Sequence, residues 1–434
     1  MIKNRTRIAA AGLLAAGALA LAACSEGAAP SAEALDPANV PEGETTITVW
    51  SFLPDNYDGG AEAYEAVIAA FQDKYPQVTV ELTTMPYPTY FDQVRNATVA
   101  RKGADVVTMY GGAQAYSYRN GLYPLQDAML PEVEENLKFL PENHSEDGNL
   151  YILPTGTYGY ALLVNQELFA QAGLDPATSI ADWDGLLSTC EQLHAKGIQP
   201  FASGWKDGYM FETFMYMISS QLMDKETLDS WVAGDVPVDD ELFTKGTQYI
   251  LDMNDAGCFG GDENLGVNMY DDAFNQYYAG TAAMFAMGSL STASTASETV
   301  PSTTVMRLPQ VPDSQYEELI DAGAEAGWAV TKWTKSPEAS AAFVNFLASA
   351  EAQEILWNAV GVPPNVKNLE VEGTTDIQKA YLPLMQADEN HTGFASFPLS
   401  VLAVYERNAA PLIGGDLTID EFTEQAQSAY DKSK

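Results

Sequence analysis

The chain has 434 residues and a formal net charge of −39, with 46% hydrophobic and 11% aromatic residues. This composition is typical of a globular protein. Roughly 390 residues follow the N-terminal leader, which is too many for a single hydrophobic core and favours two lobes. The strongly negative charge repels phosphates, so it excludes nucleic acid as a partner and disfavours anionic ligands.

Residues 1–23 have the pattern of an export signal. Basic residues come first, and residues 8–23 then form an apolar, alanine-rich run that is short for a membrane span. The run ends in Leu-Ala-Ala-Cys24, which resembles the bacterial lipobox, whose cysteine becomes the first residue and carries lipid. The alternative is a plain secretory peptide. Small, acidic and proline residues in 24–44 predict a flexible tether that holds a folded domain near a membrane.

Alternating strands and helices are predicted next. Their ranges are a strand at 45–52, a helix ended by Pro76, a strand at 78–82, a helix at about 89–102 and a short apolar strand at 106–107. This order predicts a parallel sheet with right-handed crossovers. Binding sites in such sheets lie at the carboxyl ends of the strands, which here are residues 50–52 and 109–112.

Residues 149–169 have the pattern of a crossing between two lobes. An aromatic, β-branched run is interrupted by Pro154, which lacks the amide proton of a sheet ladder. A second apolar run follows Tyr158 and Tyr160. Two strands in line with a bend between them suit a segment that passes from one lobe to the other, with its tyrosines facing a cleft. An edge hairpin with core tyrosines stays open as the alternative.

The second half of the chain continues the α/β pattern. The expected elements are a helix capped by Asp182, a turn-rich loop at 200–208, a Met-rich core helix at 210–223, a helix at 271–278, a strand at 280–290, a Ser/Thr-rich loop at 291–304, a strand within 323–331, a helix from Ser336, a rigid bend at 361–365 and a helix that opens with a capping box at Thr418.

Cysteine usage allows one disulfide. Cys190 and Cys258 are the two cysteines after Cys24, and an oxidising exterior would let them pair. Cys190 also fits the apolar face of a helix, so a buried free thiol is the alternative. The absence of a CxxC motif, together with only 3 histidines, predicts no metal site, and nothing in the sequence predicts a cofactor.

Seven segments in register resemble extracellular solute-binding proteins of carbohydrate ABC transporters, the family-1 type that includes maltodextrin-binding proteins. They are ITVWSF, FQDKYPQVTVE, GADVVTMYGGAQAYSYRNGLYPL, LYILPTGTYGYALLVNQELFAQAGLDP, GTAAMFAMGS, the stretch from AGWAVTKW to GVPPN, and LTIDEFTEQAQ. The resemblance covers residues 45–434. It implies an α/β, two-lobed periplasmic-binding-protein-like fold of type II, with mainly parallel sheets, flanking helices and a cleft between the lobes. The implied lobes are 45–154 plus 316–365, and 155–315 plus 366–434.

The resemblance also implies a set of substrate-binding residues. These are Trp50, Ser51, Phe52, Asp55, Tyr110, Gly111, Tyr158, Trp205, Asp207, Met287, Ser289 and Trp328. Flat aromatic rings cover the C–H face of a pyranose, and a few placed polar groups satisfy its hydroxyls. Core packing is the alternative for each aromatic. Many relatives have tryptophan where this chain has Leu290, so a maltodextrin preference is not carried over.

The sequence therefore predicts a lipid-anchored, monomeric substrate-binding protein of an ABC importer. It would capture a sugar, expected to be an oligosaccharide, and deliver it to the permease at the extracytoplasmic face of the cell membrane. We expect no enzyme, because the GxSxG and P-loop patterns are absent. The alternatives are a cell-surface carbohydrate-active hydrolase, which would need two positioned carboxylates, and a binding protein for a non-sugar solute.

Overall fold

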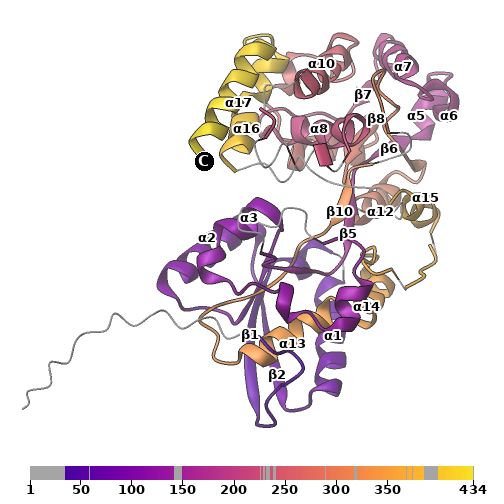
Figure 1. Cartoon of the computed structure of the whole chain (residues 1–434). Coiled ribbons are helices and arrows are strands. Elements are labelled where there is room, and N and C mark those ends of the chain that lie inside the picture. The colour runs from indigo at the N-terminus through magenta and orange to yellow at the C-terminus, as the bar shows by residue number, and fades with distance from the viewer. Residues whose placement is uncertain are drawn as a thin grey trace, which may run out of the picture. The chain divides into compact units, whose positions relative to one another are not determined.

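The computed structural model describes residues 35–57, 59–140, 149–224, 226–227, 230, 235–237, 241–288, 290–316, 320–367, 369–373, 375–385 and 399–433 (Figure 1). The predicted signal segment 1–23, Cys24 and Ser289 lie outside these residues. Within the described ranges, no helix has both the length and the apolar character that a membrane span requires.

The first lobe is built on a five-stranded sheet with the order β2-β1-β3-β11-β4. Its elements are β1 (Thr45–Ser51), η1 (Leu53–Asn56), α1 (Gly60–Lys74), β2 (Val78–Thr84), α2 (Tyr87–Ala100), β3 (Val106–Met109), α3 (Gly112–Ser117), η2 (Arg119–Gly121), η3 (Gln126–Ala128), α4 (Pro131–Asn136), β4 (Leu153–Pro154), β11 (Gly327–Val330), α13 (Pro337–Leu347) and α14 (Ala350–Val360). β1 pairs in parallel with β2 and β3, as the strand–helix–strand order predicts, whereas β11 pairs antiparallel with β3 and β4.

The second lobe has a four-stranded sheet with the order β7-β8-β6-β9. Its elements are β6 (Ala161–Asn165), α5 (Gln166–Gln171), α6 (Pro176–Ser179), α7 (Trp183–Ala195), β7 (Gln199–Phe201), α8 (Tyr209–Leu222), α10 (Glu241–Asp255), η4 (Asp262–Asn264), η5 (Met269–Ala273), α11 (Phe274–Tyr278), β8 (Ala282–Met287), α12 (Leu290–Thr299), β9 (Thr303–Met306), α15 (Asp376–Met385), α16 (Leu399–Ile413) and α17 (Ile419–Ser433). β6 is antiparallel to β8 and β9, while β7 is parallel to β8. Both sheets are therefore mixed, which corrects the expectation of mainly parallel sheets.

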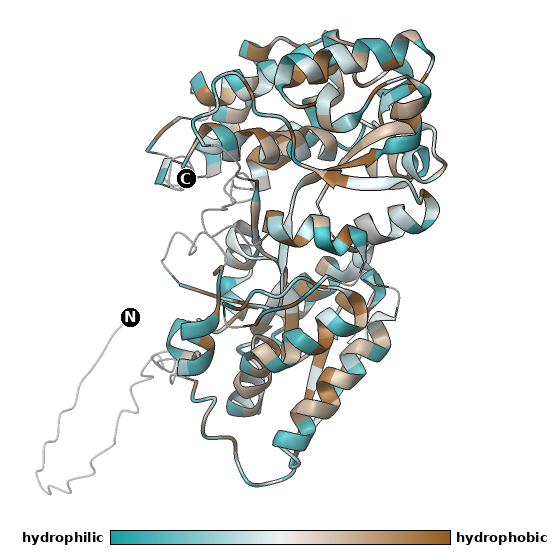
Figure 2. Ribbon diagram, turned by 90° about the vertical axis from the view of Figure 1, so that its right-hand side faces the viewer, coloured by the Kyte–Doolittle hydropathy of each residue, from teal (hydrophilic) through white to brown (hydrophobic). Residues whose placement is uncertain are grey.

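Two separate hydrophobic cores define the lobes. One core holds residues up to Leu153 and resumes at Ala326, and the other begins at Tyr160 and includes Ala322. The helices around both sheets carry hydrophilic and hydrophobic residues in alternation, as expected when one face packs on a sheet (Figure 2).

The chain segments that join the lobes are hydrogen-bonded to one another. β5 (Thr157–Gly159) and β10 (Ala322–Ala324) pair antiparallel. The Thr157 amide donates to the Pro363 carbonyl at 2.8 Å, and the Glu325 amide donates to the Gly156 carbonyl at 2.9 Å. A side chain at Gly156 would lie 2.5 Å from a methyl carbon of Val362, so only glycine permits this close approach.

Local capping patterns are confirmed. The Gly185 amide donates to the Asp182 carboxylate at 2.8 Å, and Thr418 and Glu421 exchange the two bonds of a capping box. α8, the expected Met-rich core helix, is buried from Met210 to Leu222.

Two expectations need correction. Residues 291–304 were expected to form a loop, but α12 covers most of them. Ala296 is fully buried, so one side of this helix packs on the core, which the Ser/Thr-rich composition did not indicate. The tether was expected to reach residue 44. Leu35 is only 7% exposed in the first-lobe core and Val40 packs against that core, so the fold begins earlier.

Candidate functional site

An aromatic cluster lies where β1, β2 and β3 end in the first lobe. We call it the first-lobe aromatic cluster, and its members are Phe52, Tyr87, Tyr90, Phe91 and Tyr110. The ring centroid of Phe52 lies 5.0 Å from that of Tyr87 and 5.6 Å from that of Tyr110. Phe52 is fully buried, whereas the Tyr87 side chain is 48% exposed and Tyr110 is half-buried. The cluster thus has a buried floor and two tyrosines that reach solvent.

Hydrogen bonds hold this cluster in place. The Tyr90 hydroxyl lies 3.0 Å from the Trp50 carbonyl and 2.9 Å from the Thr108 carbonyl, so it bridges β1 and β3. Partial burial raises the pKa of Tyr87, and its hydrogen bond with the Tyr110 hydroxyl acts in the opposite direction. The two outer rings are therefore preorganised as a pair.

The other residues predicted near the end of β1 have different surroundings. Ser51 is fully buried, and its hydroxyl accepts hydrogen bonds from the Thr108 hydroxyl at 2.8 Å and the Leu53 amide at 3.0 Å. The ring of Trp50 lies against Gly103, where an added side-chain carbon would come within 3.1 Å of it. Asp55 is exposed in η1. Ser51 and Trp50 thus make structural contacts in this lobe.

Trp328 lies in the core of the first lobe beside the lobe-joining segments. Its side chain is 1% exposed, its indole nitrogen donates to the Thr155 hydroxyl at 3.1 Å, and its ring lies 5.9 Å from that of Tyr64. The half-buried Glu325 follows β10 nearby. Burial raises the pKa of Glu325, and its charge adds to the burial that raises the pKa of Tyr64 and Tyr381.

Tyrosines also gather where the chain enters the second lobe, on β5, just before β6 and on α8. This second-lobe tyrosine cluster consists of Tyr158, Tyr160, Tyr209 and Tyr216. The hydroxyls of Tyr160 and Tyr209 are 3.1 Å apart, and the Tyr160 ring centroid lies 4.8 Å from that of Tyr216 and 5.8 Å from that of Tyr158. A side chain at Gly288 would come within 2.6 Å of the Tyr160 ring, so glycine allows the end of β8 to approach the cluster.

The loop after β7 carries two of the predicted residues, Trp205 and Asp207, which have different surroundings. Trp205 is 1% exposed, and its ring packs edge-on against Phe259 at 4.8 Å, so it offers no face to a ligand in this structure. Asp207 is half-buried, and its carboxylate accepts from the Met269 amide at 2.9 Å and the Tyr209 amide at 3.3 Å. Asp207 therefore fixes the start of α8 beside the second-lobe tyrosine cluster.

The predicted residues thus fall into distinct environments. Residues that reach or border the two clusters are Phe52, Tyr110, Gly111, Tyr158, Asp207 and Met287, whereas Ser51, Trp205 and Trp328 are buried in the cores. Sequence reasoning missed Tyr87 and Tyr209. The position of Tyr87 directly after β2 could have identified it. β2 is parallel to β1, so the carboxyl ends of both strands, where ligands bind, lie on the same side of the sheet. Tyr209 begins the helix that follows the 200–208 loop.

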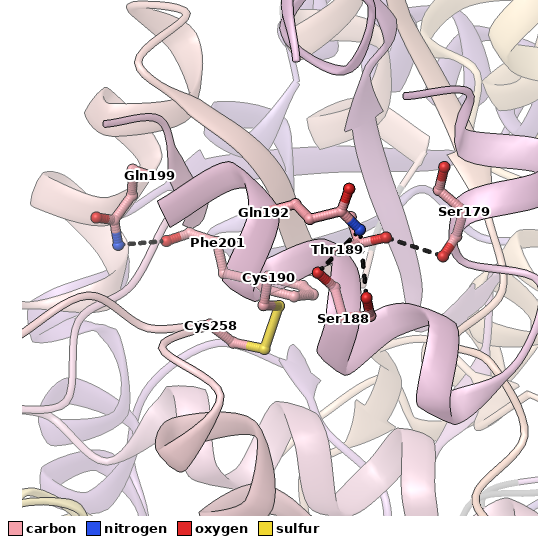
Figure 3. The surroundings of a disulfide bond; sticks show 8 residues. All are labelled: Ser179, Ser188, Thr189, Cys190, Gln192, Gln199, Phe201 and Cys258. Carbon is pink, nitrogen blue, oxygen red and sulfur yellow. Dashed lines mark hydrogen bonds between the residues drawn. A yellow bond between two sulfur atoms is a disulfide. The ribbon is translucent and has the colours of Figure 1, made fainter. Parts of the chain in front are cut away.

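A disulfide joins Cys190 of α7 to Cys258, with Cα atoms 4.8 Å apart (Figure 3). Both cysteines are fully buried. The Phe201 amide donates to the Cys258 carbonyl at 3.0 Å, and the Ser203 hydroxyl donates to the Phe259 carbonyl at 2.7 Å. The disulfide therefore anchors the segment that supports the loop carrying Asp207. Within the part of the chain that the structure describes, no group of three or more His, Cys, Asp or Glu residues could hold a metal ion.

Glu212 makes the stability of the second lobe sensitive to pH. It is 6% exposed in α8, and burial, with smaller contributions from Glu406 and Asp207, raises its pKa from 4.5 to about 8. Between these values the folded state holds a proton that the unfolded state has lost, so this group's contribution to stability falls as pH rises from about 4.5 to about 8.

We expect Glu212→Gln to remove this contribution. One pKa unit corresponds to about 1.4 kcal/mol, so the wild type should lose up to a few kcal/mol more than the variant between pH 5 and pH 8. Denaturant titration of both proteins at the two pH values measures the difference. Parallel pH profiles for the two proteins would show that Glu212 does not titrate in this range.

The chain thus has two hydrophobic cores that are joined by three hydrogen-bonded segments, and a cluster of aromatic side chains lies in each lobe. These features define the class as a two-lobed α/β solute-binding fold. The sequence matches the family of bacterial extracellular solute-binding proteins over residues 55–354, and the chain belongs to that family.

One curated relative and two solved structures illustrate what the chain is similar to. An uncharacterized ABC transporter extracellular-binding protein of Pyrococcus horikoshii is 21% identical over 343 residues, which are 76% of this chain and 74% of the relative. A solved structure from work on xylan utilization by Caldanaerobius polysaccharolyticus superposes with a TM-score of 0.75 at 18% identity, covering 88% of this chain and 99% of the other. A chitin oligosaccharide binding protein superposes with a TM-score of 0.74 at 22% identity, covering 89% and 98%.

Proposed function

We propose that this protein is the solute receptor of an ABC importer and that its solute is an oligosaccharide. The observation that carries the proposal is the first-lobe aromatic cluster, where Tyr87 and Tyr110 reach solvent over the buried ring of Phe52. Flat rings of this kind can stack on the C–H face of a pyranose while their hydroxyls bond to its rim. The chitin oligosaccharide binding protein with the same fold supports this choice of solute.

The sugar would bind in a cleft between the lobes. The first-lobe aromatic cluster would stack on it, and Tyr158, Met287 and Asp207 of the second lobe would complete the contacts. Gly111 would border the sugar after β3, and Asp55 and Ser289 would supply polar contacts. The first lobe, residues 35–154 plus 326–365, and the second lobe, residues 155–324 plus 366–433, would enclose it. The protein would act as a monomer and release the sugar to the permease without chemical change.

The N-terminal cysteine would attach the receptor to the cell membrane. The motif Leu-Ala-Ala-Cys24 ends an apolar run, and the folded domain begins near Leu35. The roughly ten residues between them can span at most about 38 Å when fully extended, so the receptor would stay close to its permease.

Two measurements test the proposal. In the first, cells that produce the full chain or Cys24→Ala are fractionated: the wild type should stay with the membrane and the variant should not. In the second, residues 35–434 are melted with oligosaccharides, amino acids and peptides. A ligand at 100 times its dissociation constant adds about 2.7 kcal/mol, which shifts the melting temperature measurably. If only peptides or amino acids shift the melting temperature, the sugar assignment is overturned. If no compound shifts it, the receptor assignment is overturned.

A further inference from the structure

Three carboxylates lie near one another beside the second-lobe tyrosine cluster, since the charges of two of them act on the pKa of the third. We call them the carboxylate cluster, and they are Asp207, Glu212 and Glu406. Asp207 precedes α8, Glu212 lies in its first turns, and Glu406 belongs to α16. Gly208 brings them together: it has a φ of 71° and packs directly on the backbone of Glu406, where any larger residue would collide.

The buried member of this cluster has an unused acceptor. Glu212 is 6% exposed, and its Oε1 atom has no hydrogen-bond partner among the residues that the structure describes. None of the ion pairs between described residues involves a member of the carboxylate cluster. Burying such a group without a partner destabilises a protein, and its like-charged neighbours add to the cost. A positively charged group placed here would relieve both effects.

Tyrosine rings stand around the same carboxylates. The Tyr209 amide donates to Asp207, and Tyr216 lies one turn beyond Glu212 in α8. The charge of Glu212 adds to the burial that raises the pKa of Tyr216 and Tyr405, so its field reaches both hydroxyls. Aromatic faces attract cations through their quadrupole, and carboxylates favour a cation further. This combination of groups matches an ammonium group better than it matches a neutral hydroxyl.

We infer that the carboxylate cluster and its tyrosines bind a cationic amino group of the ligand, which makes the preferred solute an oligosaccharide that contains amino sugars. The inference rests on the proposed function and narrows its solute class. The chain's net charge of −39 favours the approach of such a ligand. The competing explanation is a glutamic acid that stays protonated in the core and contacts no ligand.

A matched pair of probes tests the inference. The β-1,4-linked trimer of glucosamine and its fully N-acetylated form share length and linkage, but only the first carries ammonium groups in mildly acidic buffer. Calorimetric titration of the full chain in detergent should show the glucosamine trimer binding at least about tenfold more tightly. Glu212→Gln should abolish that preference and, above pH 8, raise the melting temperature of the free protein, because the wild type then carries a buried charge that the variant lacks. Glu191→Gln, a charge loss at an exposed site on α7, should change neither.

The outcomes separate this inference from the proposed function. Equal or tighter binding of the N-acetylated trimer, or a preference that survives Glu212→Gln, would overturn the inference and leave a receptor for neutral sugars. The inference would also be overturned if neither trimer binds while neutral oligosaccharides of other composition raise the melting temperature. Failure of every sugar would overturn both proposals.

Discussion

Replacing Cys190 and Cys258 by alanine is expected to lower the free energy of unfolding by about 4 kcal/mol. The two cysteines are 68 residues apart in sequence. Closing a loop of that length in the unfolded chain removes conformational entropy equivalent to about 4 kcal/mol at 25 °C. Denaturant titration of residues 35–434 measures the loss as a lower midpoint.

One control separates the effect of the cross-link from the effect of side-chain packing. Both cysteines are fully buried, so alanine also removes side-chain contacts. Reducing the wild type under denaturing conditions breaks the bond and keeps the sulfur atoms, and we expect most of the loss to appear there as well. Equal stability of oxidised and reduced wild type would contradict the expectation.

The disulfide should also affect ligand binding. The disulfide holds the segment that contains Phe259. The Phe259 carbonyl accepts a hydrogen bond from the Ser203 hydroxyl, and the Phe259 ring packs on Trp205. Ser203 and Trp205 belong to the loop that leads to Asp207. The reduced protein should therefore bind its sugar more weakly under conditions where it remains folded.

Replacing Tyr87 and Tyr110 together by alanine is expected to weaken oligosaccharide binding by about 100-fold. Burying an aromatic side chain stabilises by about 1.5 kcal/mol or more, so each ring should contribute about a factor of ten to the affinity. Because the Tyr87 side chain is 48% exposed, the free protein should lose little stability. Titration calorimetry with the sugar found by thermal shift measures the change in affinity.

Variants of single tyrosines sharpen this prediction. Tyr87→Phe keeps the stacking face and loses only the hydroxyl that bonds to Tyr110, so it should weaken binding much less. Tyr75→Ala removes a half-buried tyrosine of the same lobe that packs on Phe71, outside the cluster, and should leave the affinity unchanged. Full affinity in the double variant, or an equal loss in Tyr75→Ala, would exclude the cluster as the stacking surface.

Much of the fold was predictable because local signals decide it. Alternating apolar residues predicted β1 and β2, and capping side chains placed the starts of α7 and α17. The antiparallel pairing of β11 was not predictable, because it depends on a strand far away in sequence. α12 was missed because tertiary packing of Ala296 outweighs the weak helix propensity of serine and threonine.

The candidate site was less predictable than the fold. Residue type and position at a strand end identified Tyr110 and Tyr158 as candidates. The same criteria also selected Trp205 and Trp328, which the structure buries in the cores. Sequence gives no measure of exposure at such positions. Glu212 escaped notice because one acidic residue among 60 carries no signal until its burial is known.

The most direct test of the receptor assignment is a calorimetric titration of residues 35–434 with the oligosaccharide that most raises the melting temperature, followed by chemical analysis of the recovered sugar. We expect one binding site with a dissociation constant in the micromolar range or below, about −8 kcal/mol, and a sugar recovered intact. Shortened sugar products would identify a hydrolase, and the absence of binding heat with every oligosaccharide would contradict a sugar receptor.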